Sequence, residues 1–247
     1  MADTAPIAFP EGAGRHRLLS VIVPVYNERN TVSEILRRMR LVELPVDLEI
    51  VVVDDGSTDG TDKVLTTVED STVRVVRHPH NQGKTAAIRT GLAHARGDAI
   101  LIQDADLEYD PADWPRLLAP LLGGKAKVVY GSRFRGERST MKLSRWVGNR
   151  LLSGAATVLY NATLSDVETG YKLFDRTVLD GLVITSDGFG FEPEVTAKVL
   201  RRGHAIYEVP VSYTGRGAAE GQSFTWKDGL RSMGVLIRWR FSPVDKP

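Results

Sequence analysis

The first half of the chain alternates apolar runs with amphipathic stretches. A short apolar run rich in β-branched residues predicts a buried strand, whereas apolar residues that recur every three or four positions predict a helix. We expect strands at residues 18–25, 48–53, 73–77 and 99–102, and helices that begin at residue 32 and extend over residues 62–68 and 84–95. This order predicts an α/β fold with a mainly parallel central sheet flanked by helices.

The second half of the chain is less regular. Strands are expected at residues 128–130 and 206–213, and a helix is expected over residues 147–159. Residues 226–241 combine a helical period with both apolar and basic positions, which predicts an amphipathic terminal helix. Residues 215–221 are rich in glycine and predict a flexible loop.

Polar residues follow three of the predicted strands at their carboxyl ends. In a parallel sheet these ends meet at one edge, and ligands bind there. We therefore expect one binding site built from three pairs of side chains, which are Asn27 with Glu28, Asp54 with Asp55, and Asp104 with Asp106.

The strand predicted at residues 99–102 leads into three carboxylates, Asp104, Asp106 and Glu108. Alternate side chains of an extended backbone share one face, so the three groups are expected to converge. Like charges repel unless a cation lies among them, and Mg²⁺ and Mn²⁺ prefer oxygen ligands. Taken alone, the pattern favours a polar turn after a strand over a divalent metal site, and the metal interpretation depends on the rest of the chain.

A basic segment lies opposite these acids in the predicted arrangement. Residues 133–150 hold six basic residues against one acid, Glu137. Arg133 follows a strand and a glycine, whereas Arg138 and Lys142 are expected on a solvated helix face. A metal held by acids can carry a diphosphate, and arginines hold a second phosphate by paired hydrogen bonds. This suits transfer from a nucleotide-diphosphate donor to an anionic acceptor.

Composition excludes several other classes. The chain of 247 residues has no cysteine, so disulfides, zinc-thiolate sites and thiol catalysis are ruled out. A net charge of +1 gives no basis for a nucleic-acid partner. Neither a P-loop nor a Gly-x-Gly-x-x-Gly turn is present. No secretory leader or membrane span is expected, and the histidines are expected to be structural.

Five motifs together carry a family resemblance. They are Val-Pro-Val-Tyr-Asn-Glu at 23–28, Val-Asp-Asp-Gly-Ser-Thr-Asp at 53–59, Asn-Gln-Gly-Lys at 81–84, Asp-Ala-Asp at 104–106, and Gly-Ser-Arg at 131–133. In order and spacing the chain resembles family 2 glycosyltransferases over roughly residues 18–241. It is most similar to the dolichyl-phosphate mannose synthase branch and its bacterial polyprenyl-phosphate sugar synthase relatives. The resemblance implies a GT-A fold, with Rossmann-like binding of a nucleotide sugar.

The resemblance also implies a role for individual residues. Donor-binding residues would be Pro24, Tyr26, Glu28, Asp54, Asp55, Lys84, Asp104 and Arg216. Asp104, Asp106 and Glu108 would hold Mg²⁺ or Mn²⁺, although the family often has Gln at the last position. Catalytic residues would be Asp106, Arg133 and Arg145, and the acceptor phosphate would be bound by Arg145, Asn149 and Ser223.

The implied activity is a metal-dependent hexosyltransferase that inverts the anomeric centre. The donor would be GDP-mannose by default, with UDP-glucose and UDP-N-acetylhexosamine as competitors, and the acceptor a polyprenyl phosphate. We expect a cytoplasmic protein, peripheral on the cytoplasmic face of the membrane. The terminal helix could reach the membrane interface, pack on the core, or act beside a small membrane subunit.

The chain is accordingly divided into three parts, a disordered lead-in over residues 1–17, a GT-A catalytic domain over residues 18–225, and an amphipathic helix and tail over residues 226–247. Two rival functions stay open. A soluble glycosyltransferase with a saccharide or small-molecule acceptor would need a general base, for which Asp166, Glu168 and Glu192 are candidates. A scaffold subunit that binds nucleotide sugar without catalysis is the other.

Overall fold

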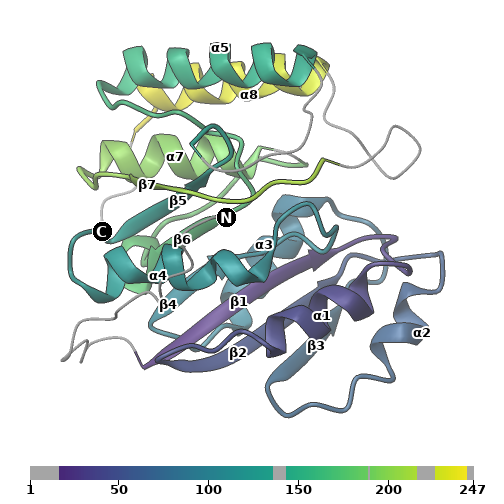
Figure 1. The fold of residues 1–247 in the computed structure, drawn as a ribbon. Helices are drawn as coiled ribbons and strands as arrows, with labels where there is room; N and C mark the ends of the chain where they lie inside the picture. The colour runs from purple at the N-terminus through teal and green to yellow at the C-terminus, as the bar shows by residue number, and fades with distance from the viewer. Residues whose placement is uncertain (1–16, 136–142, 189, 216–225, 244–247) are drawn as a thin grey trace.

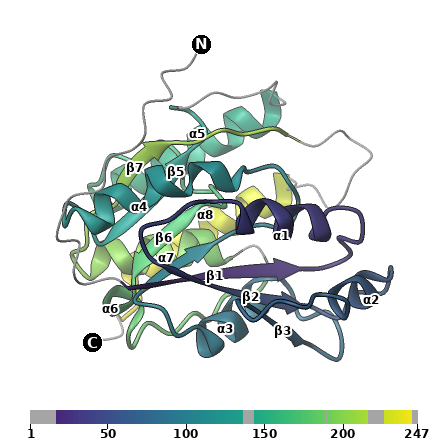
Figure 2. The same ribbon diagram turned by 60° about the horizontal axis from the view of Figure 1, so that its bottom comes forward.

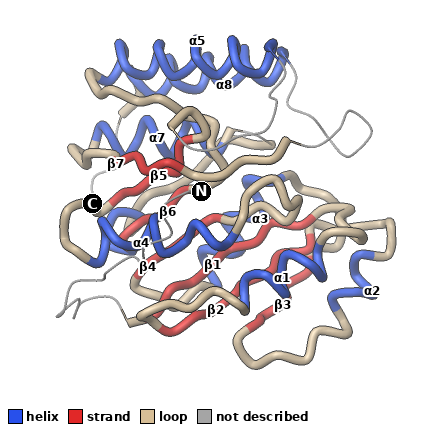
Figure 3. The backbone as a smooth tube through the Cα atoms, in the orientation of Figure 1, coloured by secondary structure: helices blue, strands red, loops and turns tan. Residues whose placement is uncertain are grey.

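The computed structural model describes residues 17–135, 143–188, 190–215 and 226–243. Its centre is a seven-stranded sheet in the order β3-β2-β1-β4-β6-β5-β7 (Figures 1 and 3). The strands are β1 (Leu18–Val25), β2 (Asp47–Asp54), β3 (Val73–Arg77), β4 (Ala99–Ile102), β5 (Val128–Ser132), β6 (Lys172–Asp175) and β7 (Tyr207–Pro210). The predicted α/β fold with a mainly parallel sheet is therefore confirmed.

Strand β6 is the exception to parallel pairing. It lies between β4 and β5 and runs antiparallel to both. Ile102 at the end of β4 pairs with Lys172 at the start of β6. The segment that precedes β6 therefore reaches the same sheet edge as the carboxyl ends of the parallel strands.

Helices cover both faces of the sheet. The helices are α1 (Val32–Arg40), α2 (Thr61–Leu65), α3 (Lys84–His94), α4 (Trp114–Leu122), α5 (Leu143–Tyr160), α6 (Arg176–Leu179), α7 (Phe191–Arg201) and α8 (Trp226–Phe241), with a 3₁₀ turn, η1, at Pro111–Asp113. Apolar residues of α1 and α4 bury one face of the sheet, and those of α3 and α7 bury the other. Alternate residues of the central strands supply both cores, as expected for strands buried on two sides.

Helices α5 and α8 form an outer layer beyond α7. They lie side by side in both views (Figures 1 and 2). Leu152 and Ala156 of α5 pack with Leu236 and Trp239 of α8 in a separate apolar cluster, which also includes Ala197 of α7. No helix within the described ranges is both long enough and apolar enough to cross a bilayer.

The elements up to residue 102 agree closely with their prediction, whereas four later elements, α4, β6, α6 and α7, were not predicted. Helix α4 contains Pro115 at its first turn and Pro120 within it, which obscures the helical signal. Strand β6 is only four residues long, which is too short to give a clear periodic signal. Helix α7 was not predicted either. Its buried face is polar as well as apolar, because Glu194 and Lys198 lie buried within it.

Candidate functional site

The site lies where β1, β2, β4 and β5 end and where β6 begins. Val25 of β1 is in register with Asp54 of β2, and both Ile102 and Tyr130 pair with Lys172. Parallel strands and one antiparallel strand thus deliver polar side chains to a single edge. This is the edge at which ligands bind in open α/β sheets.

The backbone after β4 turns instead of staying extended. Leu107 has a positive φ of 62°. The Asp106 carboxylate accepts a hydrogen bond from the backbone N–H of Glu108 at 3.1 Å, which closes a tight turn. The expectation that Asp104, Asp106 and Glu108 alternate on one extended face is therefore wrong. A local side-chain hydrogen bond competes with the extended conformation here.

Lys84 lies between two carboxylates that are distant in sequence. Its Nζ is 2.7 Å from Oδ1 of Asp104 and 2.9 Å from Oε1 of Glu192. Burial alone would lower the pKa of Lys84, but the charges of Asp104 and Glu192 raise it well above its ordinary value. We call Lys84, Asp104 and Glu192 the lysine cluster. Oε2 of Glu192 is buried and has no hydrogen-bond partner among the described residues.

Arg133, Asp166 and Asn149 form a second group, the arginine cluster. Asp166 is fully buried and accepts four hydrogen bonds. Three come from the backbone and guanidinium of Arg133, at 2.7–3.0 Å, and one comes from the Asn149 amide at 2.7 Å. Burial would raise the pKa of Asp166, but Arg133 holds it below its ordinary value.

The loop that carries Asp166 is fixed by other contacts. The backbone N–H groups of Ser165 and Asp166 donate to the carboxylate of Glu208 in β7. The Arg133 guanidinium also lies over the Tyr213 ring, 5.3 Å from its centroid. Both ends of the arginine cluster are therefore held by the sheet.

Gly170 lies against the Asp104 side of the lysine cluster. A Cβ atom at this position would collide with Oδ2 of Asp104 and with the Tyr109 ring. Its N–H donates to the Tyr109 hydroxyl at 2.9 Å. Only glycine leaves room here for the Asp104 carboxylate, so this backbone forms a close wall of the site.

The residues present fit a hard divalent cation held by two carboxylates together with oxygens of a bound diphosphate. Asp104 and Asp106 offer oxygen ligands beside the Gly170 wall, which suits Mg²⁺ or Mn²⁺. The Tyr213 hydroxyl donates to Glu108 at 3.0 Å. In the part of the chain that the structure describes, no three or more Asp, Glu or His side chains gather closely enough to hold a metal without such a ligand.

The predicted nucleoside-side residues lie at the ends of β1 and β2. Pro24 and Tyr26 are half-buried. The Glu28 carboxylate accepts from the Thr31 hydroxyl at 2.5 Å. Asp54 is buried, and its Oδ1 accepts from the backbone of Ser57. Oδ2 of Asp54 has no hydrogen bond from the residues that the structure describes but lies 3.3 Å from Nε of Arg77 in β3.

Asp55 fixes a loop. Its carboxylate contacts Nδ1 of His78 at 2.7 Å and accepts from the backbone N–H groups of Gln82 and Gly83. The other ring nitrogen of His78 lies 2.8 Å from the Thr90 hydroxyl. The expected structural role of His78 is confirmed, because these bonds set the entry to α3, where Lys84 begins the helix.

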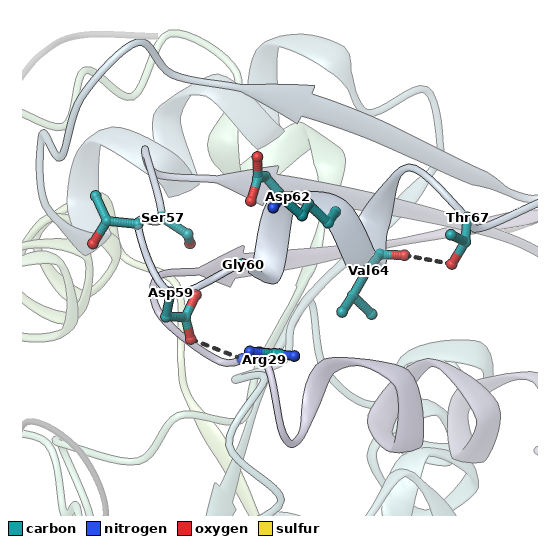
Figure 4. A pocket seen from close by; sticks show the side chains of 9 residues that line it. Arg29, Ser57, Asp59, Gly60, Asp62, Val64 and Thr67 are labelled. Atoms are coloured by element: carbon teal, nitrogen blue, oxygen red, sulfur yellow. Dashed lines mark hydrogen bonds between the residues drawn. The ribbon is translucent and has the colours of Figure 1, made fainter.

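A surface depression of about 620 Å³ lies beside this edge, around the turn between β2 and α2 (Figure 4). Arg29, Ser57, Asp59, Asp62 and Thr67 are among the residues that line it. The backbone N–H of Arg29 donates to Asp59 at 3.1 Å across it. The depression contains neither cluster.

The sequence did not predict that Glu168 and Lys172 interact with one another close to the site. Burial and the charge of Glu192 raise the pKa of Glu168. Burial lowers the pKa of Lys172. Nζ of Lys172 donates to the carbonyl oxygens of Val167 and Thr169. Glu168 and Glu192 had been considered only as general bases, and nothing in their spacing indicated that they would adjoin one another.

The structure does not describe the side chains of three predicted site residues. Arg216 and Ser223 lie outside the described residues, as does the side chain of Arg145. Asn149, predicted beside Arg145 at the acceptor phosphate, is buried against Asp166.

Comparison with known proteins gives a consistent family. The model of "Glycosyl transferase family 2" matches residues 20–182. The glycosyltransferase AglJ of Haloferax volcanii is 32% identical over 220 residues, which are 88% of this chain and 69% of that protein. The dolichol-phosphate mannosyltransferase of Pyrococcus furiosus is 28% identical over 90% of this chain and 64% of its own length.

A bacterial relative is named for the transfer of a different sugar. The undecaprenyl-phosphate 4-deoxy-4-formamido-L-arabinose transferase of Pseudomonas fluorescens is 32% identical over 80% of this chain and 58% of its own length. This chain therefore spans only part of each of these relatives.

Solved structures agree on the fold. Glucosyl-3-phosphoglycerate synthase from Mycobacterium tuberculosis with UDP superposes with a TM-score of 0.72 at 25% identity, covering 94% of this chain and 83% of that one. Further structures of that enzyme hold Mn²⁺ with UDP-glucose and phosphoglyceric acid, or Mg²⁺ with UDP.

Proposed function

The chain belongs to glycosyl transferase family 2 and has its GT-A fold, and from this premise we propose that it transfers a sugar from a nucleotide-diphosphate donor to a polyprenyl phosphate. Relatives named for dolichol phosphate and undecaprenyl phosphate support this acceptor class. The product would be a lipid-linked monophosphate sugar with inverted anomeric configuration.

The observation that carries the proposal is the placing of two opposite kinds of group at one sheet edge. Asp104, beside Asp106, supplies carboxylates for a metal–diphosphate complex, while Arg133 supplies a buried cation. Asp104 packs against Gly170, which lies four residues after Asp166 in the same loop, so donor and acceptor phosphates would lie at one sheet edge. A binding scaffold without catalysis has no need of both groups.

The acceptor explains why no general base is required. A phosphate monoester carries between one and two negative charges near neutral pH, so its oxygen is already a nucleophile. Asp166 is fully hydrogen-bonded and has a lowered pKa, which makes it a poor proton acceptor. Its part is to orient Arg133, which would hold the attacking phosphate in line with the anomeric carbon.

Asp104 and Asp106 would hold Mg²⁺ or Mn²⁺, whereas the Glu108 carboxylate, the third ligand predicted from the sequence, accepts a hydrogen bond from Tyr213. When bound, the metal neutralises charge on the departing diphosphate. Lys84 adds a second positive charge at Asp104, within the reach of a donor phosphate. Arg145, Arg216 and the predicted nucleoside-side residues retain their proposed roles in donor and acceptor binding.

The donor sugar and base are the finer part of the proposal. GDP-mannose is the default because of the mannosyltransferase relative, whereas the solved neighbours bind UDP or UDP-glucose. A thermal-shift panel of GDP, UDP and their sugars with Mn²⁺ separates these, because a ligand that binds the native state raises its melting temperature.

The experiment for the reaction uses radiolabelled nucleotide sugars, polyprenyl phosphate in detergent and Mn²⁺, with extraction of lipid-linked label. Asp106→Ala is expected to lower transfer at least about a hundredfold, because a metal ligand is lost. Asp47→Ala, an exposed residue at the far end of β2, is the control and should retain full activity. Transfer by Asp106→Ala at the native rate would overturn the assignment. Label on a water-soluble acceptor alone would indicate a small-molecule glycosyltransferase instead.

We further propose a peripheral position on the cytoplasmic face of the membrane, where nucleotide sugars are made. A lipid acceptor supports this position, because its phosphate stays at the bilayer surface. A small membrane subunit is a second route to the same place. Binding of the purified chain to protein-free lipid vesicles would indicate the direct route, whereas binding only to native membranes would indicate a membrane subunit.

A further inference from the structure

Helix α5 exposes an apolar stripe on the side opposite its packed face. Val147, Leu151, Gly154 and Val158 follow one another at intervals of four, three and four residues, which places them on one side of a helix. The Leu151 side chain is 66% exposed and that of Val158 is 83% exposed. Leu152 on the inner side is buried, so the exposed stripe is additional to the packed one.

Helix α8 repeats this arrangement with the same spacing. Its stripe consists of Leu230, Gly234, Ile237 and Phe241. Leu230 is 63% exposed and Phe241 is 79% exposed. Leu236 and Trp239 face the interior. The two outermost helices of the protein thus each carry a second, uncovered apolar side.

The two stripes belong to one layer. Helices α5 and α8 lie side by side, and α7 separates α8 from the sheet (Figures 1 and 2). Isolated apolar residues are common on protein surfaces, but here six exposed apolar side chains are aligned on two helices that contact one another. We call these two stripes together the α5–α8 face.

The charges on these helices are almost all positive. Basic residues in the two helices are Arg145, Arg150, Lys227, Arg231, Arg238 and Arg240, whereas Asp228 is the one acid. Asp228 lies 3.4 Å from Arg231, which neutralises it. Arg150 and Arg238 are exposed. An apolar stripe bordered by arginines is complementary to apolar acyl chains beneath anionic headgroups.

We propose that the α5–α8 face docks on the anionic surface of a lipid bilayer, with both helices lying in the plane of the interface. The charge pattern favours lipid over a second copy of this chain, because two such faces would bring arginines against arginines. The aliphatic stems of arginine can also lie along acyl chains while their charged ends reach the headgroups. This proposal deepens the proposed function, and its biological meaning rests on it.

The geometry of α5 connects this face with the site. Leu151 points outward, while Asn149, two residues earlier and therefore on the opposite side of the helix, donates to Asp166 beneath it. Asp166 in turn holds Arg133. One helix, about 10 Å across, thus separates the docked surface from the arginine that would receive the acceptor phosphate. A polyprenyl phosphate could present its headgroup without leaving the bilayer.

The test is flotation of the purified chain with vesicles of phosphatidylcholine, with and without phosphatidylglycerol. The native chain is expected to float with the anionic vesicles and less with the neutral ones. The double variant Leu151→Ser/Phe241→Ser should lower the bound fraction on the order of tenfold or more, because each large apolar side chain contributes to insertion. The matched control is Leu41→Ser/Val183→Ser, which alters side chains that are 67% and 57% exposed elsewhere on the protein.

Charge is tested in the same assay. Arg238→Glu should weaken binding to anionic vesicles several-fold, whereas Arg74→Glu, an exposed arginine on β3, should not. Equal flotation of the two apolar double variants would overturn the proposal, as would failure of the native chain to float. A melting curve for each variant shows that the fold is retained.

Activity separates this proposal from the proposed function. With polyprenyl phosphate in detergent micelles, Leu151→Ser/Phe241→Ser should transfer sugar at the native rate, and with the same acceptor in vesicles it should be slower by the factor that its binding loses. If transfer occurs but the variant matches the native chain on vesicles, the docking face is wrong and the function stands. If the native chain floats yet transfers no sugar from any donor, the function is wrong and the docking face stands.

Discussion

The lysine cluster and the arginine cluster lie at the same sheet edge but differ in how completely their polar atoms are paired. In the arginine cluster, Asp166 has no exposed surface, and its carboxylate accepts hydrogen bonds from Arg133 and Asn149 on both oxygens. In the lysine cluster, Lys84 and Asp104 are each about a fifth exposed, and Glu192 keeps one buried oxygen without a partner among the described residues.

This difference indicates that the two clusters have different structural roles. A buried charge pair with every hydrogen bond made is rigid and is costly to break. An incompletely paired group in a partly open site can exchange protein contacts for ligand contacts. We therefore interpret the arginine cluster as a frame that fixes Arg133, and the lysine cluster as the part that changes partners when a donor binds.

The largest effect is expected from breaking the frame. Asp166→Ala leaves the Arg133 guanidinium buried without its counter-charge, and removal of one partner of a buried ion pair costs about 3–5 kcal/mol. Urea denaturation measures this loss in the free energy of unfolding. The control is Arg40→Ala, which removes a 3.3 Å surface pair with Asp70 and should cost less than about 1 kcal/mol. Similar losses in the two variants would show that the arginine cluster is no frame.

A smaller effect, on activity and not on stability, is expected from the open cluster. Lys84→Met removes the cation between Asp104 and Glu192, so the donor diphosphate loses a positive charge and meets two uncompensated carboxylates. Transfer should fall about 10- to 100-fold, mainly through a higher donor KM, which corresponds to about 1.4–2.7 kcal/mol. Steady-state kinetics measure it, with the exposed Lys125→Met as control. An unchanged donor KM would contradict an exchange of partners at Lys84.

The smallest effect is a pH dependence that belongs to the arginine cluster. The pKa of Asp166 is lower in the folded protein than in the unfolded chain, where it is about 3.9. Its contribution to stability is therefore complete above that value and is lost as pH falls through the folded pKa. Unfolding free energies measured from about pH 5 to pH 2 should fall more steeply for the native chain than for Asp166→Asn. Parallel slopes would assign the acid sensitivity to other carboxylates.

The two clusters also differ in what the sequence could reveal. Asp104 and Arg133 were predicted because each follows a strand that ends at a ligand-binding edge. Asp166 and Glu192 were candidates only as general bases, and their pairing with these residues was not predicted, because Glu192 lies in helix α7 and Asp166 in the loop before β6, two elements that were missed. Local periodicity cannot show which loop folds over which strand end, and the contact of Lys84 with Glu192 spans 108 positions.

The fold of the first half was predicted almost residue by residue. Continuous apolar runs such as Ala99–Ile102 leave little choice for a buried strand. The turn after it was missed because Asp106 bonds to the backbone of Glu108, a local interaction that overrides alternation. The prediction that the carboxylates alternate after residue 102 failed, whereas the prediction of a buried strand at residues 99–102 is confirmed.

The reversed direction of β6 has a consequence for how such a protein can be changed. Because β6 starts at the site and leads away from it, residues 164–171 enter the edge as a segment separate from the parallel strands that hold the donor-side residues. Asp104 after β4 and Asp166 before β6 thus lie in different stretches of chain, and Gly170 of the second stretch packs against Asp104. Exchange of residues 164–171 between relatives would therefore change one wall of the proposed site and leave in place the strand ends that carry Asp54 and Asp104.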